Sequence, residues 1–259
     1  MIDTHCHLQD PPLWDQLPDV LARAAAAGVG ALVVPGVDAA SSREAVRLAG
    51  AHAGVWAAVG FHPWRVAAGL GVDLPLLREL AASPRVVALG EIGLDGALEP
   101  ANLDAQLGAL RAQVALAREL DLPVLIHSRG ATDRLLDALA DARPAAPGLL
   151  HSFGGSPETA RELIRRGWAL GVGGVATRPW SKRARATVQA VPLEHLVLET
   201  DAPWIGTLKV AKGAVEPCHL GEARAVVAEL KGVDEATVDR VTSATARRIL
   251  RLPENPSAA

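Results

Sequence analysis

The segment Ile2-Asp3-Thr4-His5-Cys6-His7 decides between the two folds that the rest of the sequence allows. Short apolar or β-branched runs alternate with helical periodicity along almost the whole chain, which predicts parallel strands joined by crossover helices. A doubly wound sheet would usually carry a glycine-rich phosphate loop after its first strand. Here the first strand ends in His5-Cys6-His7 instead. The sequence therefore favours an α/β fold of the (β/α)8 TIM-barrel type.

Eight candidate strands lie between the helical stretches, as a barrel requires. They cover residues 2–7, 31–35, 55–60, 86–91, 124–127, 149–151, 169–172 and 196–200. The helical stretches show apolar residues at steps of three and four, as Leu103, Leu107 and Leu110 do. The last two, residues 220–230 and 237–250, have no strand between them, so one of them caps or extends the barrel. We predict a single domain over residues 1–252 and a flexible tail over residues 253–259.

Length and composition are consistent with this fold and restrict the function. The chain has 259 residues, and one such barrel typically needs about 250. The formal net charge of -3 excludes a broadly basic surface, so affinity for nucleic acid would have to come from local groups or bound cations. Two cysteines make no disulfide framework, and neither an export signal nor a membrane span is visible. We expect a cytoplasmic protein without a membrane partner.

His5 and His7 are the first candidate metal ligands. Side chains alternate along a strand with a period of two, so these two histidines point to the same face and can bind one ion. Cys6 points to the opposite face and is expected to be a small packed residue. A His-x-His pair alone is weak evidence for a metal site.

Four further candidates follow from the positions of the other strands. Glu91, His127 and His151 end strands in this prediction, and Asp201 directly follows one. In a barrel the carboxyl ends of the strands converge on one mouth, where active sites lie. Burying so many polar groups together would be costly unless cations compensated their desolvation. We predict divalent metal binding, for which imidazole and carboxylate are suitable ligands, by the set His5, His7, Glu91, His127, His151 and Asp201.

Other residues near the predicted mouth are candidates for substrate contacts. His62 lies just past the third strand, where it can face the site without being a ligand; packing is the alternative. Arg178 and Lys182 follow the seventh strand, near the place where barrels often bind phosphate, or they simply begin a solvated helix. Arg129, two residues after His127, is assigned to substrate binding as well.

Three tryptophans are expected in loops at the same mouth, although the chain has no Tyr and only two Phe. Stacking of a nucleobase on an aromatic ring contributes about 1–3 kcal/mol without demanding a base sequence. We predict that one or more of these rings stack on a base, while shielding of the metals from water is nearly as good an explanation. The residues are Trp64, Trp180 and Trp204.

The same segments resemble the TatD-type metal-dependent deoxyribonucleases, a branch of the amidohydrolase-like metallo-hydrolases. The resemblance spans nearly the whole chain and rests on short motifs in a fixed order. These are Asp3-Thr4-His5-Cys6-His7-Leu8, Gly60-Phe61-His62-Pro63, Gly90-Glu91-Ile92-Gly93-Leu94-Asp95, Ile126-His127-Ser128-Arg129, His151-Ser152-Phe153-Gly154-Gly155-Ser156, Glu199-Thr200-Asp201-Ala202-Pro203 and Glu216-Pro217-Cys218-His219.

The resemblance implies a site for two divalent ions, Zn, Mg or Mn. One ion would be held by His5, His7, Glu91 and Asp201, the other by Glu91, His127 and His151, so that Glu91 bridges them. In two-metal chemistry such ions polarise the scissile phosphate and activate a water, and Asp201 could orient that water and accept its proton. Glu91 and Asp201 are therefore the expected catalytic residues.

The leading functional hypothesis is a deoxyribonuclease that hydrolyses phosphodiester bonds at the ends of single-stranded DNA, since a narrow barrel mouth cannot engulf a duplex. A second hypothesis keeps the metals and changes the substrate to an ester or amide, as in a D-aminoacyl-tRNA deacylase. A third is a non-catalytic barrel that binds a partner and retains the metals for stability. The open two-ion arrangement argues against the third, because structural zinc sites are generally closed by four ligands.

Overall fold

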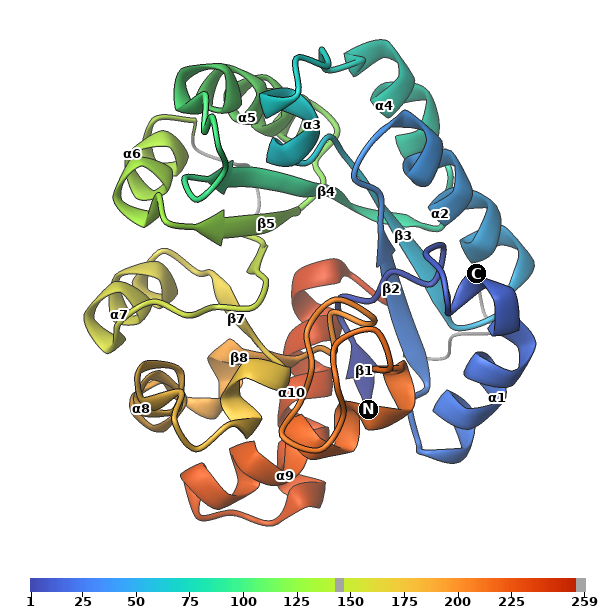
Figure 1. Ribbon diagram of the computed structural model, residues 1–259, viewed down its shortest axis with the longest axis vertical. Helices are drawn as coiled ribbons and strands as arrows, with labels where there is room; N and C mark the ends of the chain where they lie inside the picture. The colour runs from blue at the N-terminus through green and yellow to red at the C-terminus, as the bar shows by residue number, and fades with distance from the viewer. Residues whose placement is uncertain (143–146, 255–259) are drawn as a thin grey trace.

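The strands form one parallel sheet that curls into a barrel. The computed structural model describes residues 1–142 and 147–254. Within these residues, eight parallel strands neighbour one another in chain order, which confirms the predicted TIM barrel (Figure 1). They are β1 (Ile2–Asp3), β2 (Ala31–Pro35), β3 (Val55–Val59), β4 (Val86–Asp95), β5 (Val124–Arg129), β6 (Leu149–Leu150), β7 (Ala169–Val172) and β8 (Leu196–Leu198).

Helices surround the sheet (Figure 1). Several begin at residues that suit a helix start. Asp38 accepts from the backbone N–H of Ser41, whose hydroxyl accepts from the backbone N–H of Asp38, and this capping box starts the second helix. The α-helices are α1 (Leu17–Ala26), α2 (Ala39–Ala51), α3 (Pro63–Ala67), α4 (Leu74–Ala81), α5 (Leu103–Glu119), α6 (Thr132–Ala142), α7 (Pro157–Arg165), α8 (Lys182–Ala190), α9 (Leu220–Lys231) and α10 (Glu235–Leu250).

The hydrophobic core has two parts. The larger lies between the strands and the surrounding helices, and α5 contributes its buried Leu110, Val114 and Ala117, as the helical periodicity predicts. The smaller part consists of strand residues that alternate with those of the larger part, such as Ala31 and Val33, and it joins them and Ile2 to Ala246, Ile249 and Leu250 of α10. Helix α10 therefore covers the amino-terminal end of the barrel, which confirms that one of the last two helices caps it.

The predicted ends of two strands that carry candidate ligands are wrong. Strand β4 continues to Asp95 and β5 to Arg129, so Glu91 and His127 lie within strands rather than at their ends. The register of β4 against β5 shifts at Glu91, whose backbone N–H donates to the carbonyl of Gly36 at 2.8 Å. Pairing resumes beyond the shift because Gly93 lies so close to β5 that a Cβ there would be 2.0 Å from the carbonyl oxygen of His127.

Strand β1 is also shorter than predicted, because regular pairing ends at Asp3. Beyond it, backbone hydrogen bonds of 2.8 to 3.0 Å join the segment after β1 to β8 and the segment after it, and so close the barrel. They run from Thr4 N to Leu198 O, from Asp201 N to His5 O and from His7 N to Ala202 O. We call this junction between residues 4–7 and 198–202 the seam of the barrel. The same two segments carry His5, His7 and Asp201, three of the candidate metal ligands.

Asp3 reinforces this seam with its buried carboxylate. One oxygen accepts hydrogen bonds from the backbone N–H groups of Thr200 and His5, at 3.0 and 3.2 Å, and the other accepts from the Thr200 hydroxyl at 2.7 Å. Burial raises the pKa of Asp3 to about 7, although these hydrogen bonds act to lower it. Asp3 therefore ties β1 to the segment after β8.

No helix in the two described stretches, residues 1–142 and 147–254, is long and apolar enough to cross a membrane. Most of the predicted flexible tail, residues 255–259, lies outside the described residues.

Asp3→Ala should lower the free energy of unfolding by at least about 2 kcal/mol, because it leaves two buried N–H donors unsatisfied and each costs about 1–3 kcal/mol. Asp3→Asn, which keeps an acceptor oxygen, should lose less. Urea denaturation followed by circular dichroism measures both. The control is Asp137→Ala on the exposed face of α6, expected to change stability by less than about 0.5 kcal/mol. Equal effects of Asp3→Ala and Asp137→Ala would contradict the proposed seam.

Candidate metal centre

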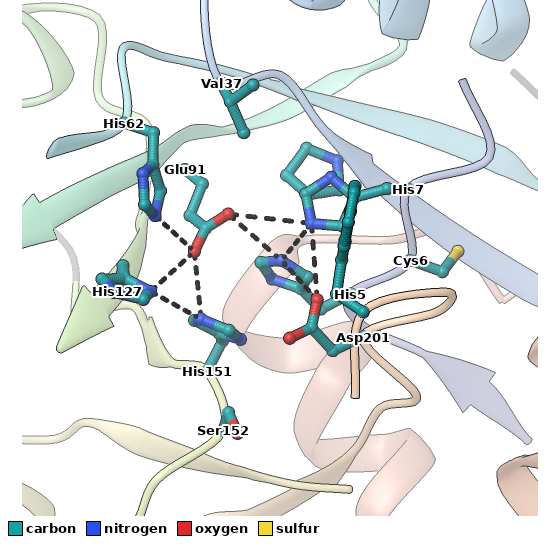
Figure 2. Close-up of polar contacts among 12 residues, drawn as sticks. His5, Cys6, His7, Val37, His62, Glu91, His127, His151, Ser152 and Asp201 are labelled. Atoms are coloured by element: carbon teal, nitrogen blue, oxygen red, sulfur yellow. Dashed lines mark hydrogen bonds and ion pairs between the residues drawn. The ribbon is translucent and has the colours of Figure 1, made fainter. Parts of the chain in front are cut away.

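The six predicted ligands lie together at one end of the barrel. Figure 2 shows His5, His7 and Asp201 on one side of Glu91, with His127 and His151 on the other. Cys6 points away from the group and is fully buried in the core, as the alternation of side chains predicts. The close approach of side chains from β4, β5 and the segments after β1, β6 and β8 makes this the candidate functional site.

Glu91 connects the two sides because each of its carboxylate oxygens faces a different pair of imidazoles. Oε2 lies 3.4 Å from His5 Nε2 and 3.8 Å from His7 Nε2. Oε1 lies 3.1 Å from His127 Nδ1 and 3.0 Å from His151 Nε2. The first pair is completed by Asp201, whose Oδ1 is 3.4 Å from His7 Nε2. This arrangement has the form of two adjacent sites that share one carboxylate.

The donor set fits divalent cations. His5 Nε2 and His7 Nε2 are 3.2 Å apart, and His127 Nδ1 and His151 Nε2 are 3.1 Å apart. Two imidazole nitrogens that face each other at such distances need a proton or a cation between their lone pairs. Three groups of three candidate ligand atoms lie within 4.8 Å of one another: His5, His7 and Glu91; His5, His151 and Asp201; and His62, Glu91 and His127. Nitrogen and oxygen donors of this kind suit Zn²⁺, Mn²⁺ and related ions.

The electrostatics of the cluster keep its carboxylates ionised. Burial acts to raise the pKa of Glu91, but His62, His151 and His5 outweigh it and hold that pKa well below its ordinary value. Burial likewise opposes ionisation of Asp201, while a hydrogen bond from His7 leads the interactions that lower its pKa. Burial lowers the pKa of His5, which favours the neutral imidazole that a metal ligand must be. Burial acts in the same direction on His7, His127 and His151, but the neighbouring carboxylates outweigh it and raise the pKa of each ring. A cation that binds these three rings would therefore displace their protons.

One residue of the cluster and one next to it in the chain have unusual backbone geometry. Asp201 and Ser152 adopt left-handed conformations, with φ of 51° and 43°. Such angles are uncommon outside glycine and concentrate at functional sites, where the surrounding structure enforces them. The geometry at Asp201 accompanies the hydrogen bond from its backbone N–H to the carbonyl of His5.

His62 faces the cluster but has the geometry of a donor rather than a ligand. Its Nδ1 accepts a hydrogen bond from the backbone N–H of Trp64 at 3.1 Å. The proton of the neutral ring is therefore on Nε2, which lies 3.4 Å from Glu91 Oε1. A nitrogen that carries a proton has no lone pair for an ion, so His62 can donate to Glu91 or to a bound anion.

The three tryptophans differ in their freedom to stack on a ligand. The indole N–H of Trp64 donates to Asp95 Oδ2, and that of Trp204 donates to Asp10 Oδ2, both at 2.9 Å. The ring of Trp204 also lies below the Lys212 ammonium, 5.4 Å from the ring centroid. Trp180 is 69% exposed, against 46% and 40% for the other two. Among the three, Trp180 offers the largest free ring surface.

The three cationic residues that the sequence assigns to substrate binding differ in what their side chains contact. Arg178 donates to the carbonyl of Gly206 at 2.6 Å and so helps to hold the loop after β8. Arg129 is half-exposed and lies 3.7 Å from Asp95 Oδ2, beside the cluster. Lys182 begins α8 and is exposed. Arg178 is thus the one of these three whose guanidinium donates to the loop after β8.

Two buried carboxylates behind the histidines were quoted within motifs but given no role from sequence. Asp95 lies 3.3 Å from His127 Nε2, and Glu199 lies 3.6 Å from His151 Nδ1. Asp95 follows Glu91 by four residues, and alternation along β4 places both on the same face, but the sequence did not show that this strand continues beyond Glu91. For Glu199 no comparable signal exists, because its partner comes from a different strand.

Comparisons with known proteins agree with this geometry. The sequence model of the family described as TatD related DNase matches residues 2–251. The chain is 32% identical to the uncharacterized metal-dependent hydrolase YabD of Bacillus subtilis, over 97% of this chain and 99% of that protein. It is 34% identical to the 3′-5′ ssDNA/RNA exonuclease TatD of Erwinia billingiae, over 98% of this chain and all of that protein.

A solved structure has the same fold throughout. The crystal structure of YjjV, a TatD homologue from Escherichia coli K12, superposes with a TM-score of 0.94 at 32% identity and covers 98% of both chains. The family match over nearly the whole sequence, the two full-length relatives and this shared structure lead to one conclusion: the chain belongs to the family of TatD-related DNases.

Proposed function

We propose that this protein is a divalent-metal-dependent hydrolase that cleaves phosphodiester bonds, with single-stranded DNA as its preferred substrate. The observation that carries the proposal is Glu91, whose two oxygens each face a separate pair of imidazoles within 3.0 to 3.8 Å. Two ions that share a carboxylate are a recurrent arrangement in enzymes that displace groups at phosphorus. The names of the relatives, a metal-dependent hydrolase and a 3′-5′ ssDNA/RNA exonuclease, support the same activity here.

The proposed ligand sets divide at Glu91. One ion would take His5, His7, Glu91 and Asp201, and the other would take Glu91, His127 and His151. When bound, divalent ions supply Lewis acidity that polarises the phosphoryl oxygens and lowers the pKa of water. Zn²⁺, Mn²⁺ and Mg²⁺ are the candidates.

Asp201 is the residue that we assign to proton transfer. Its Oδ1 faces His5 and His7, at 3.8 and 3.4 Å, so Oδ2 is the oxygen that can orient an attacking water and accept its proton. The lowered pKa of Asp201 keeps the carboxylate ionised and hence ready to act as a base. A carboxylate that is already fixed by one oxygen holds the other in a defined direction.

The chain's own groups can hold the substrate against this centre. His62 would donate its Nε2 proton to a phosphate oxygen, since the backbone N–H of Trp64 fixes the tautomer. Arg129 and Lys182 would add positive charge that the net charge of -3 does not provide. Trp180, the most exposed of the three tryptophans that the sequence predicts at the mouth, would stack on a base of a single strand. In this proposal Trp64, Trp204 and Arg178 shape the surrounding surface, since each already donates a hydrogen bond to another residue of the protein.

Metal binding should stabilise the protein. Zn²⁺ or Mn²⁺ at about 100 times its Kd should add about 2.7 kcal/mol to chelator-treated protein, which is roughly 5–10 °C in Tm for a chain of this size. Glu91→Gln should lose most of this shift, since it removes the shared charge. Differential scanning calorimetry checks it, with Glu158→Gln on the exposed start of α7 as the control. Equal shifts in both variants would argue against a bridging role for Glu91.

Hydrolysis of end-labelled single-stranded DNA should require a divalent ion and stop on addition of a chelator. His127→Ala should reduce the rate by more than about 100-fold, because one ion loses a ligand, while Asp137→Ala should leave it unchanged. Gel analysis of nucleotide release measures this. Release that persists in chelator, or deacylation of D-aminoacyl-tRNA in place of nucleotide release, would contradict the proposed substrate.

Trp180→Ala should weaken binding of a single-stranded oligonucleotide about 5- to 150-fold, which corresponds to about 1–3 kcal/mol for one stacked base. Trp180→Phe should retain most of the affinity, because a ring remains. Fluorescence anisotropy in calcium or without metal measures the Kd without turnover. Trp14→Ala is the matched control, since Trp14 is 39% exposed and lies before α1. An unchanged Kd for Trp180→Ala would remove this residue from the binding surface.

A further inference from the structure

Two of the candidate ligands, His127 and His151, each lie between two carboxylates. The inner nitrogen of each ring faces Glu91 Oε1, at 3.1 Å for His127 Nδ1 and 3.0 Å for His151 Nε2. The outer nitrogen faces a second buried acid: His127 Nε2 is 3.3 Å from Asp95 Oδ2, and His151 Nδ1 is 3.6 Å from Glu199 Oε1. Each ring therefore lies between Glu91 and a second carboxylate. His127 turns Nδ1 toward Glu91, whereas His151 turns Nε2 toward it.

Asp95 is held firmly in its position. Its side chain is fully buried, Oδ1 accepts from the backbone N–H of Ala97 at 2.9 Å, and Oδ2 accepts from the Trp64 indole at 2.9 Å. Its backbone is fixed as well, because its N–H donates to the side-chain oxygen of Gln106 at 2.7 Å. A carboxylate held by so many donors can impose an orientation on His127.

Glu199 occupies a space made for it by a glycine. It is 1% exposed, and a Cβ at Gly171 would lie 2.1 Å from its Oε2. Its Oε1 accepts from the backbone N–H of Ser152, the residue that follows His151. Among the described residues, His151 Nδ1 has no hydrogen-bond partner, and Glu199 Oε1 at 3.6 Å is the acceptor that this nitrogen faces.

His5, on the other side of Glu91, is different. Its Nδ1 is buried and has no hydrogen-bond partner among the described residues. His127 and His151 thus face a second carboxylate with their outer nitrogens, whereas His5 Nδ1 has no such acceptor. Metal-binding histidines commonly donate their second N–H to such a group, which fixes the tautomer and makes the ligand nitrogen more basic.

We propose that Asp95 and Glu199 are positioning residues that act through His127 and His151 on one ion of the centre. Each carboxylate holds the proton on the outer nitrogen of its ring and so presents the inner nitrogen, unprotonated, beside Glu91. His127 is therefore the Nε2–H tautomer and His151 the Nδ1–H tautomer. This inference rests on the proposed function, since it requires that the centre bind metal.

The tautomers can be measured without any variant. Long-range ¹H–¹⁵N NMR of the Zn²⁺-loaded protein distinguishes Nδ1–H from Nε2–H rings, and His127→Gln and His151→Gln spectra assign the two signals. We expect opposite tautomers for the two rings. The same tautomer in both, or the reverse order, would overturn the inference.

Variants test the effect on the metal. Asp95→Asn and Glu199→Gln should each weaken Zn²⁺ binding at one of the two positions by about 10- to 100-fold, measured by competition with a chromophoric chelator. The exposed Asp137→Asn and Glu158→Gln are the matched controls and should bind as the wild type does. Wild-type affinity in both Asp95→Asn and Glu199→Gln would overturn the inference and leave the proposed function intact. Failure of the wild-type protein to bind Zn²⁺ would instead overturn the proposed function.

Discussion

The centre depends on one constraint, the burial of the Glu91 carboxylate among imidazoles at the mouth of the barrel. A buried anion is costly unless hydrogen bonds or positive charge compensate it. Here one ring nitrogen each of His5, His7, His62, His127 and His151 lies within 3.8 Å of one of its two oxygens. The histidines in turn face one another at distances that suit a cation between them. Neutral imidazoles do not balance the charges of the Glu91 and Asp201 carboxylates, and divalent ions are the simplest way to balance them.

The fold and the site are not independent, because the segments that close the barrel carry three of the proposed ligands, His5, His7 and Asp201. The backbone of Asp201 donates to His5, and the backbone of His7 donates to Ala202. Asp3 adds the side-chain link to Thr200. Pairing of the segments after the first and last strands thus brings His5 and His7 next to Asp201. The register of this pairing sets the distances between their side chains.

Much of this could be predicted from the sequence, for identifiable reasons. Alternation along a strand placed His5 and His7 on one face and Cys6 on the other, and the regular order of strands indicated a barrel. The predicted ends of β4 and β5 were wrong because the sequence does not show that Gly93 lets these two strands approach each other and pair beyond Glu91. The pairing of Glu199 with His151 and the anchoring of Trp64 and Trp204 could not be predicted either, since each joins side chains from separate segments.

We propose that two divalent ions share Glu91. Anomalous diffraction from crystals of the protein loaded with Mn²⁺ or Zn²⁺, collected at the metal edge, tests it most directly. We expect two peaks flanking the Glu91 carboxylate, one beside His5, His7 and Asp201 and the other beside His127 and His151. Peaks located elsewhere, or the absence of any peak at Glu91 in fully loaded crystals, would contradict the account.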